Sequence, residues 1–245
     1  MGARYHPESR MMRWLVLQWR APLASFGGTT IDSRGVTRDF PALSAVTGLL
    51  ANALGLDRTD TTQLDRLQER IVFGARREQE PLLGRMTDFQ TALLGSNDRG
   101  WTTRGRVEGR DGASNAEAST HIRQRDYHAD MQMTVVLHLT HAEEAPTLDD
   151  IAKALLKPAR PLFFGRKPCL PADYVLAAQE ENRWVEAEDA RAALIAIPGE
   201  GLLRAQWSAA PGTGKSLADR RNWRSGLHGG TRRVEEERIT PVTRR

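Results

Sequence analysis

The sequence has little cysteine and no long apolar run, and each absence excludes a class of protein. Cys169 is the single cysteine of the 245 residues, so no internal disulfide can form and a reducing cytoplasm is the expected compartment. The apolar runs around Leu15 and Val135 are far shorter than the roughly 20 residues of a membrane-spanning helix. No apolar segment typical of a secretory signal follows residues 1–10, which we expect to be a disordered extension. With 40% hydrophobic residues, we expect a globular protein with no membrane partner.

The motifs indicate neither a metal centre nor a cofactor. The six histidines have neither the spacing of a helical zinc site nor an HExxH pattern, and no cysteine cluster accompanies them. The segment AAPGTGKS at residues 209–216 resembles a phosphate-binding loop, but such a loop belongs at the first strand-to-helix turn of a large parallel domain. We predict a flexible turn there and no bound nucleotide.

Basic residues are concentrated in two stretches, although the net charge is only +4. Residues 156–171 contain four basic residues and no acid, and residues 219–233 contain five arginines and one aspartate. A guanidinium group can hold a phosphate through two hydrogen bonds or stack on a base. Both stretches therefore suit RNA, although a solvated basic face has the same composition.

Hydrophobic patterning predicts an α+β fold in the order strand, helix, strand, long insertion, strand, helix, strand. Strands are expected at residues 12–19, 71–76, 131–140 and 174–177, and helices from Pro41 to Gly55, over residues 62–70 and from Thr147 to Pro158. This is the split βαβ order of ferredoxin-like and RNA-recognition-motif domains, in which the first and third strands are central neighbours.

The same patterning predicts the domain organisation. A ferredoxin-like body is expected over residues 11–177, and an insertion over about residues 79–121, poor in apolar residues, should project from it. Residues 178–245 should form a small β-rich appendage, with a helix near 187–194 and strands near 202–208 and 234–239. The third strand lacks aromatic residues, so the sheet face is not expected to bind RNA, and Trp14 and Trp19 are expected in the core.

Four segments around the arginine-rich insertion carry a family resemblance. They are APLASFG (21–27), FPALSAVTGLLANALG (40–55), RDYHAD (125–130), and LKP (156–158) with FGRKPC (164–169). In this order they resemble the CasD family of type I-E CRISPR-associated Cascade subunits. Ala21, Ala24 and Phe26 replace the family's usual glycine, glutamine and tryptophan, so the contacts of that glutamine are not carried over.

The resemblance implies a modified RNA-recognition-motif palm with a β-hairpin thumb, which coincides with the insertion predicted above. It also implies a non-catalytic subunit that grips the five-prime handle of the CRISPR RNA and connects the backbone and large subunits of Cascade. The resemblance further implies that this subunit acts on target DNA only indirectly, because base pairing between guide RNA and target recognises the DNA sequence.

Chemistry and position in the chain give the expected RNA-binding residues, with no catalytic or metal-binding residue among them. Arg125, Lys157, Arg160, Arg166 and Lys167 should neutralise phosphates, and Arg104, Arg106 and Arg110 of the insertion should clasp the strand. Ser25, Arg34, Arg38 and Ser44 should reach a splayed base or a 2′-hydroxyl, the backbone amides of Gly27 and Gly28 should donate to phosphate, and Tyr127 should either stack on a base or belong to the core.

Two alternative functions remain open. Tyr127, His121 and His128 are the residue types of a metal-independent endoribonuclease that cleaves through the 2′-hydroxyl, as in the related type I-C proteins. The basic patches would equally suit a pure scaffold that binds acidic protein partners.

Overall fold

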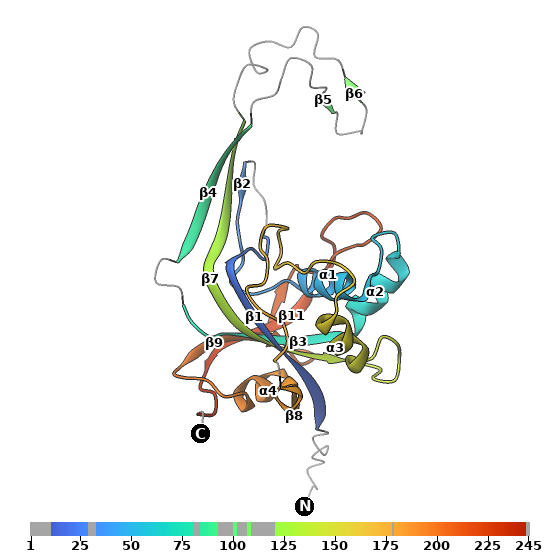
Figure 1. The fold of residues 1–245 in the computed structure, drawn as a ribbon, viewed down its shortest axis with the longest axis vertical. Coiled ribbons are helices and arrows are strands. Elements are labelled where there is room, and N and C mark those ends of the chain that lie inside the picture. The colour runs from blue at the N-terminus through green and yellow to red at the C-terminus, as the bar shows by residue number, and fades with distance from the viewer. Residues whose placement is uncertain are drawn as a thin grey trace, which may run out of the picture.

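The computed structural model describes residues 11–28, 33–80, 84–92, 100–101, 107–108, 121–177 and 179–243. The extension expected over residues 1–10 lies outside them. In the described parts the fold is mixed α/β, with a nine-stranded sheet that is antiparallel apart from β2. Figure 1 shows this sheet curving through the body of the molecule and continuing into a long arm.

The strands of this sheet come from both ends of the chain. Its main path runs β10 (Lys215–Leu217), β11 (Arg232–Ile239), β9 (Leu203–Ser208), β3 (Ile71–Arg77), β7 (His121–Leu139), β1 (Met12–Ala24) and β8 (Trp184–Ala187), while β2 (Arg34–Gly35) and β4 (Arg85–Ala92) pair with β7 off this path. A separate ladder joins β5 (Gly100–Trp101) to β6 (Val107–Glu108). The helices are α1 (Leu43–Leu54), α2 (Thr61–Arg70), α3 (Leu148–Leu156), α4 (Ala190–Ala196) and the 3-10 turn η1 (Glu180–Arg183).

The pairing of β1 with β7 confirms that the first and third strands are neighbours. β1 extends to Ala24, because residues 21–24 continue the ladder to residues 128–131 of β7 instead of forming the start of a loop. The strand expected at residues 174–177 is wrong, since only Leu176 forms an isolated bridge to β1. The position beside β1 is taken by β8, which the sequence pattern missed.

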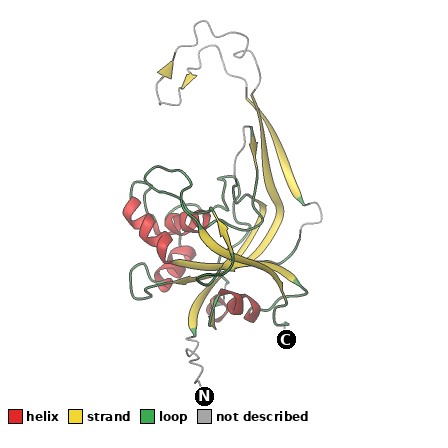
Figure 2. Ribbon diagram, turned by 180° about the vertical axis from the view of Figure 1, so that it is seen from behind, coloured by secondary structure: helices red, strands yellow, loops and turns green. Residues whose placement is uncertain are grey.

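The sheet is covered on both faces, and Figure 2 shows α4 set apart from the other three helices. The larger core places Leu17 and Val135 of the sheet with Leu50 of α1 and Ile151 of α3. The smaller core lies under α4. Trp14 belongs to the smaller core and Trp19 to the larger one, and both are at most 1% exposed, which confirms their predicted place in the core.

Apart from the short β5–β6 ladder, the described strand of the insertion, β4, forms a two-stranded antiparallel arm with β7. β4 pairs with the first residues of β7, with Arg85 opposite His128 and Ala92 opposite His121. Figure 1 shows this ladder leaving the body. β7 begins about ten residues earlier than the pattern predicted, because the strand of the arm and the central strand of the body are one continuous element. Arg104, Arg106 and Arg110 lie outside the described residues.

The C-terminal residues contribute strands to both sides of the sheet instead of forming an appendage beside it. β8 pairs with β1 at one edge, and β9 pairs with β3 and leads through β11 to β10 at the other. In the described parts of the chain, no helix combines the length and the apolarity needed to cross a membrane.

Candidate nucleic-acid interface

The residues that follow β1 form the first wall of the candidate site. Ser25 is 1% exposed; its N–H donates to the Phe164 carbonyl at 3.1 Å and its hydroxyl donates to the Asp126 carbonyl at 3.1 Å. The Ser25 hydroxyl was predicted to contact a base, but in this structure it is already hydrogen-bonded within the protein. Its role in this structure is to fix residues 164–166 against the end of β1.

The glycine pair after Phe26 presents backbone groups to the site. Gly27 has a φ of 71°, in the left-handed region that glycine adopts without steric cost, and its carbonyl accepts from the N–H of Arg38 at 2.8 Å. Within the described residues the N–H of Gly27 has no hydrogen-bond acceptor. It is thus an available donor, as the prediction of a phosphate-binding backbone requires.

Two arginines converge at the base of the arm, where Gly35 makes room for them. A Cβ at Gly35 would lie 2.7 Å from Nη1 of Arg125 and 2.9 Å from Nη2 of Arg166. The Arg166 guanidinium donates to the carbonyls of Asp126 (3.1 Å) and Gly35 (3.0 Å). The Arg125 guanidinium has no hydrogen bond or ion pair in the described residues. Arg166 is therefore fixed in place, while the charge of Arg125 remains available.

The aromatic and histidine residues of this segment are buried. Tyr127 is 5% exposed and its ring lies under the Arg166 guanidinium, 4.8 Å from centroid to Cζ. Of the two predicted roles for Tyr127, the structure therefore supports the core. His128 is 2% exposed, its Nε2 lies 2.7 Å from the Arg38 carbonyl, and burial lowers its pKa. His121 has no described side chain.

The remaining predicted residues divide into partnered and free groups. Arg34 donates twice to Gln124, at 3.0 and 2.9 Å, and Arg160 bonds the Leu56 carbonyl and the Asp57 carboxylate. Lys157 and Lys167 are exposed and have no ion-pair partner in the described residues. Arg38 donates to the Ala218 carbonyl at 2.8 Å, while its buried Nη1 has no partner there.

A cleft of about 410 Å³ brings part of this set together. It lies between residues 25–27, one face of α1, residues 163–166 and residues 221–223 of the C-terminal region. Five predicted residues line it, namely Ser25, Gly27, Ser44, Arg160 and Arg166. Arg34, Arg38, Arg125, Tyr127, Lys157 and Lys167 are not among its lining residues.

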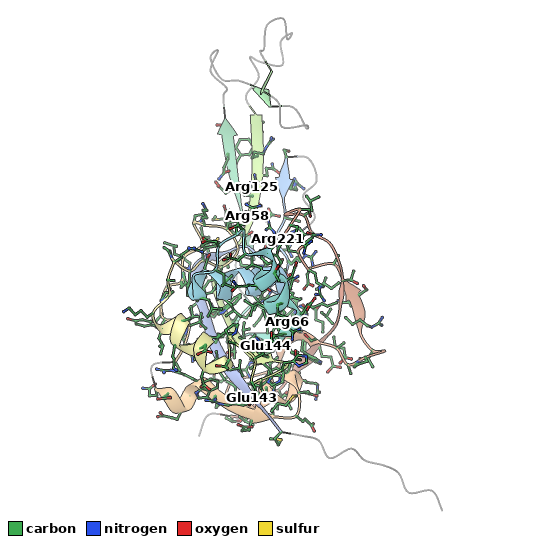
Figure 3. The ribbon with its side chains drawn as sticks, turned by 90° about the vertical axis from the view of Figure 1, so that its right-hand side faces the viewer. Arg58, Arg66, Arg125, Glu143, Glu144 and Arg221 are labelled. Carbon is green, nitrogen blue, oxygen red and sulfur yellow. The ribbon has the colours of Figure 1, made fainter. Side chains whose placement is uncertain are left out.

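The lining residues that were not predicted include two arginines and a tryptophan, Arg58, Arg221 and Trp223. Burial, and then the neighbouring charge of Arg58, lowers the pKa of Arg221, and neither arginine has an acidic partner in the described residues. Figure 3 shows Arg125, Arg58 and Arg221 on the same face of the molecule. The arginine-rich stretch was visible in the sequence, but nothing in its pattern indicated that it folds against α1.

Comparisons with known proteins identify the family. The family model described as CRISPR-associated protein (Cas_Cas5) matches residues 14–235. The chain belongs to the Cas5 family. The CRISPR system Cascade subunit CasD of Escherichia coli (strain K12) is 31% identical to it over 160 residues, which are 65% of this chain and 67% of that protein. The family resemblance of the four sequence segments is thereby confirmed.

Two solved structures share the fold of this Cas5 chain. A chain of a CRISPR RNA-guided surveillance complex superposes with a TM-score of 0.67 at 21% identity, covering 93% of this chain and 90% of that one. A crystal structure of a Cas protein superposes with a TM-score of 0.59 at 22% identity, covering 93% and 97%. At these identities the likeness supports the fold alone.

Proposed function

We propose that this Cas5 chain is a non-catalytic, RNA-binding subunit of a type I-E Cascade surveillance complex, which grips the five-prime handle of the CRISPR RNA. The observation that carries the proposal is the group of arginines without acidic partners, Arg125, Arg58 and Arg221, on one face of a Cas5-family chain. Unneutralised guanidinium groups on one face bind a phosphate backbone and release its counterions. The chain meets target DNA only through the pairing of guide and target.

The topology is consistent with a ferredoxin-like palm and a thumb. The strands β8, β1, β7 and β3 lie in the order fourth, first, third, second along the sheet, which is the order expected of a split βαβ domain. The arm of β4 and β7 takes the place of the thumb. Arg125 lies where the arm meets the body, so a strand of RNA held there would contact both.

The binding surface lies in loops and at helix ends and not on the sheet. An RNA-recognition motif stacks bases on aromatic residues of its central strands. Here Trp14, Trp19 and Tyr127 of the central strands are all buried. The cleft beside α1 and the base of the arm are therefore the surfaces that we assign to the handle, and the remaining faces are left for the backbone and large subunits.

Replacing Arg125 by alanine is expected to weaken the binding of a synthetic RNA with the host's repeat-derived handle sequence by roughly tenfold. Because one phosphate contact is lost, the slope of log affinity against log salt should fall by about one. Fluorescence anisotropy over a salt series measures both. Arg20→Ala is the control, since the Arg20 side chain also has no partner in the described residues; it is exposed where Arg125 is half-buried, and it lines a different groove. Equal losses of RNA affinity in Arg125→Ala and Arg20→Ala would contradict the assignment of RNA binding to the face that carries Arg125.

The enzyme alternative predicts cleavage of repeat RNA without metal. The Tyr127 ring is buried under Arg166 and the His128 Nε2 is engaged with a backbone carbonyl, so neither presents a free acid or base to an RNA strand. We expect repeat RNA to remain intact after incubation with the protein in EDTA, as resolved on a denaturing gel. Site-specific cleavage that is lost in Tyr127→Phe would establish the endoribonuclease instead.

A further inference from the structure

Gly48 occupies an unusual position in α1. It lies in the middle of the helix, where glycine is less favourable than every residue except proline. A Cβ built at Gly48 would have no atom within 4 Å, so packing within the described chain does not require glycine here. Gly48 lines the cleft. The missing side chain therefore leaves room for a group that comes from outside the chain and approaches the helix backbone.

The opposite wall of the cleft offers hydrogen-bond donors without acceptors. Nε of Arg221 and Nε1 of Trp223 are buried, and neither has a partner in the described residues. The Arg221 guanidinium lies 5.3 Å from the Trp223 ring centroid. The Arg221 guanidinium also has no acidic partner in the described residues, so this wall carries a positive charge that suits a ligand with negative charge.

This wall is held in place by α2. The Gln68 side chain donates to the Arg221 carbonyl at 3.0 Å and accepts from the Arg221 N–H at 3.0 Å. Gln68 is 3% exposed, so both bonds are shielded from water. The C-terminal wall is thus fixed opposite α1.

The interior of the cleft suits a flat, partly apolar group. Its lining includes Phe26, Leu49, Leu56, Leu64 and Phe163, and its volume of about 410 Å³ falls in the roughly 300–1,000 Å³ range of small-ligand pockets. Ser44 and Asn52, one helical turn on either side of Gly48, also line it. Their hydroxyl and amide groups can bond the edge of a base.

We propose that this cleft binds one unstacked nucleotide of a single-stranded RNA. The base lies against α1 at Gly48 and contacts Trp223, and Arg58 and Arg221 hold the adjoining phosphate. Proteins usually recognise single-stranded RNA in this way: a base leaves its stack and packs on an aromatic ring, and arginine contacts the phosphate. The inference rests on the proposed function and adds to it a defined subsite that includes the C-terminal region.

The test uses the chain assembled with its partner subunits on handle RNA that carries 2-aminopurine at one position at a time. We expect one position to change its fluorescence on binding. That change should be lost in Gly48→Leu, and RNA affinity should fall at least tenfold, because the side chain fills the space of the base. Gly48→Ala should raise the melting temperature, since alanine favours the helix, and weaken binding by a smaller factor.

Arg221→Ala tests the same subsite without altering the helix. It should lower affinity roughly tenfold, whereas Arg224→Ala, an exposed residue of the same stretch that does not line the cleft, should change it less than twofold. RNA binding that is unchanged in both Gly48→Leu and Arg221→Ala would overturn this inference alone. A wild-type complex that binds no RNA would overturn the proposed function as well.

Discussion

Replacing Asp219 by alanine is expected to lower the free energy of unfolding by about 3–5 kcal/mol, because it leaves a buried arginine without its counterion. Asp219 is fully buried, and its Oδ2 accepts from Nε of Arg232 at 2.8 Å. Burial lowers the pKa of Arg232, and Asp219 opposes that effect. Removing the carboxylate leaves the cost of desolvating Arg232 without compensation.

The same aspartate fixes the start of α1. Its Oδ2 also accepts from the Leu43 N–H at 3.0 Å, and its carbonyl accepts from the Ser44 N–H at 3.0 Å. The N-cap residue, Ala42, has no side chain that could make such a bond. Loss of a capping carboxylate contributes about 1 kcal/mol, so Asp219 joins the C-terminal region to the helix that lines the cleft.

Urea unfolding followed by circular dichroism measures this loss of stability. Asp149→Ala is the control, since it removes an exposed carboxylate that pairs with Arg13 at 2.9 Å and should cost at most about 1 kcal/mol. Asp219→Asn keeps one acceptor but not the charge, so its loss of unfolding free energy should lie between those of the two alanine variants. Equal midpoints for Asp219→Ala and Asp149→Ala would show that the buried pair does not stabilise the fold.

Replacing Gly165 by alanine should have the second large effect. A Cβ at Gly165 would lie 1.6 Å from the Ser25 carbonyl oxygen, closer than any non-bonded contact allows, and its φ is +94°. Residues 164–166 must therefore move away from the end of β1. We expect the free energy of unfolding to fall by about 3 kcal/mol or more, as the sum of backbone strain and this displacement.

The matched control for Gly165 is Gly212→Ala. Gly212 has a similar φ of +86°, but a Cβ there would meet no atom within 4 Å. It should cost only the strain of the left-handed backbone, about 1–2 kcal/mol. The difference between the two variants measures the close approach to Ser25, and RNA affinity should fall in Gly165→Ala alone. Equal unfolding energies would mean that residues 164–166 accommodate the added methyl group.

The sequence pattern predicted the helices and central strands well. α2 and α3 end within a residue or two of their predicted positions, whereas the predicted alternation in β1 is wrong, since Trp14 to Leu17 are all buried in a sheet that is covered on both faces. β8 was missed because it has only four residues, too few to show a period. The first residues of β7 were missed because they pair with β4 in the arm and carry polar side chains, whose pattern resembles that of a loop.

The candidate site was predicted in part. Arginines in the right segments could be named, but composition does not say which charges are already neutralised. Arg160 is paired with Asp57, and Arg166 is bonded to backbone carbonyls, while Arg125 has no partner in the described residues. Arg221 lies in a basic stretch whose composition suits RNA, but it was not named as a binding residue, because its place beside the cleft depends on its contacts with Gln68.

By itself the sequence determined the element types, the family and the concentration of basic residues, since the period of apolar side chains and the order of motifs are properties of neighbouring residues. Only the tertiary structure decided which cations remain free and which segments enclose the cleft. Those outcomes depend on contacts between residues far apart in the chain, such as Asp219 with Leu43 and Gln68 with Arg221. Such contacts are set by the packing of the whole sheet and its helices, and no local pattern encodes them.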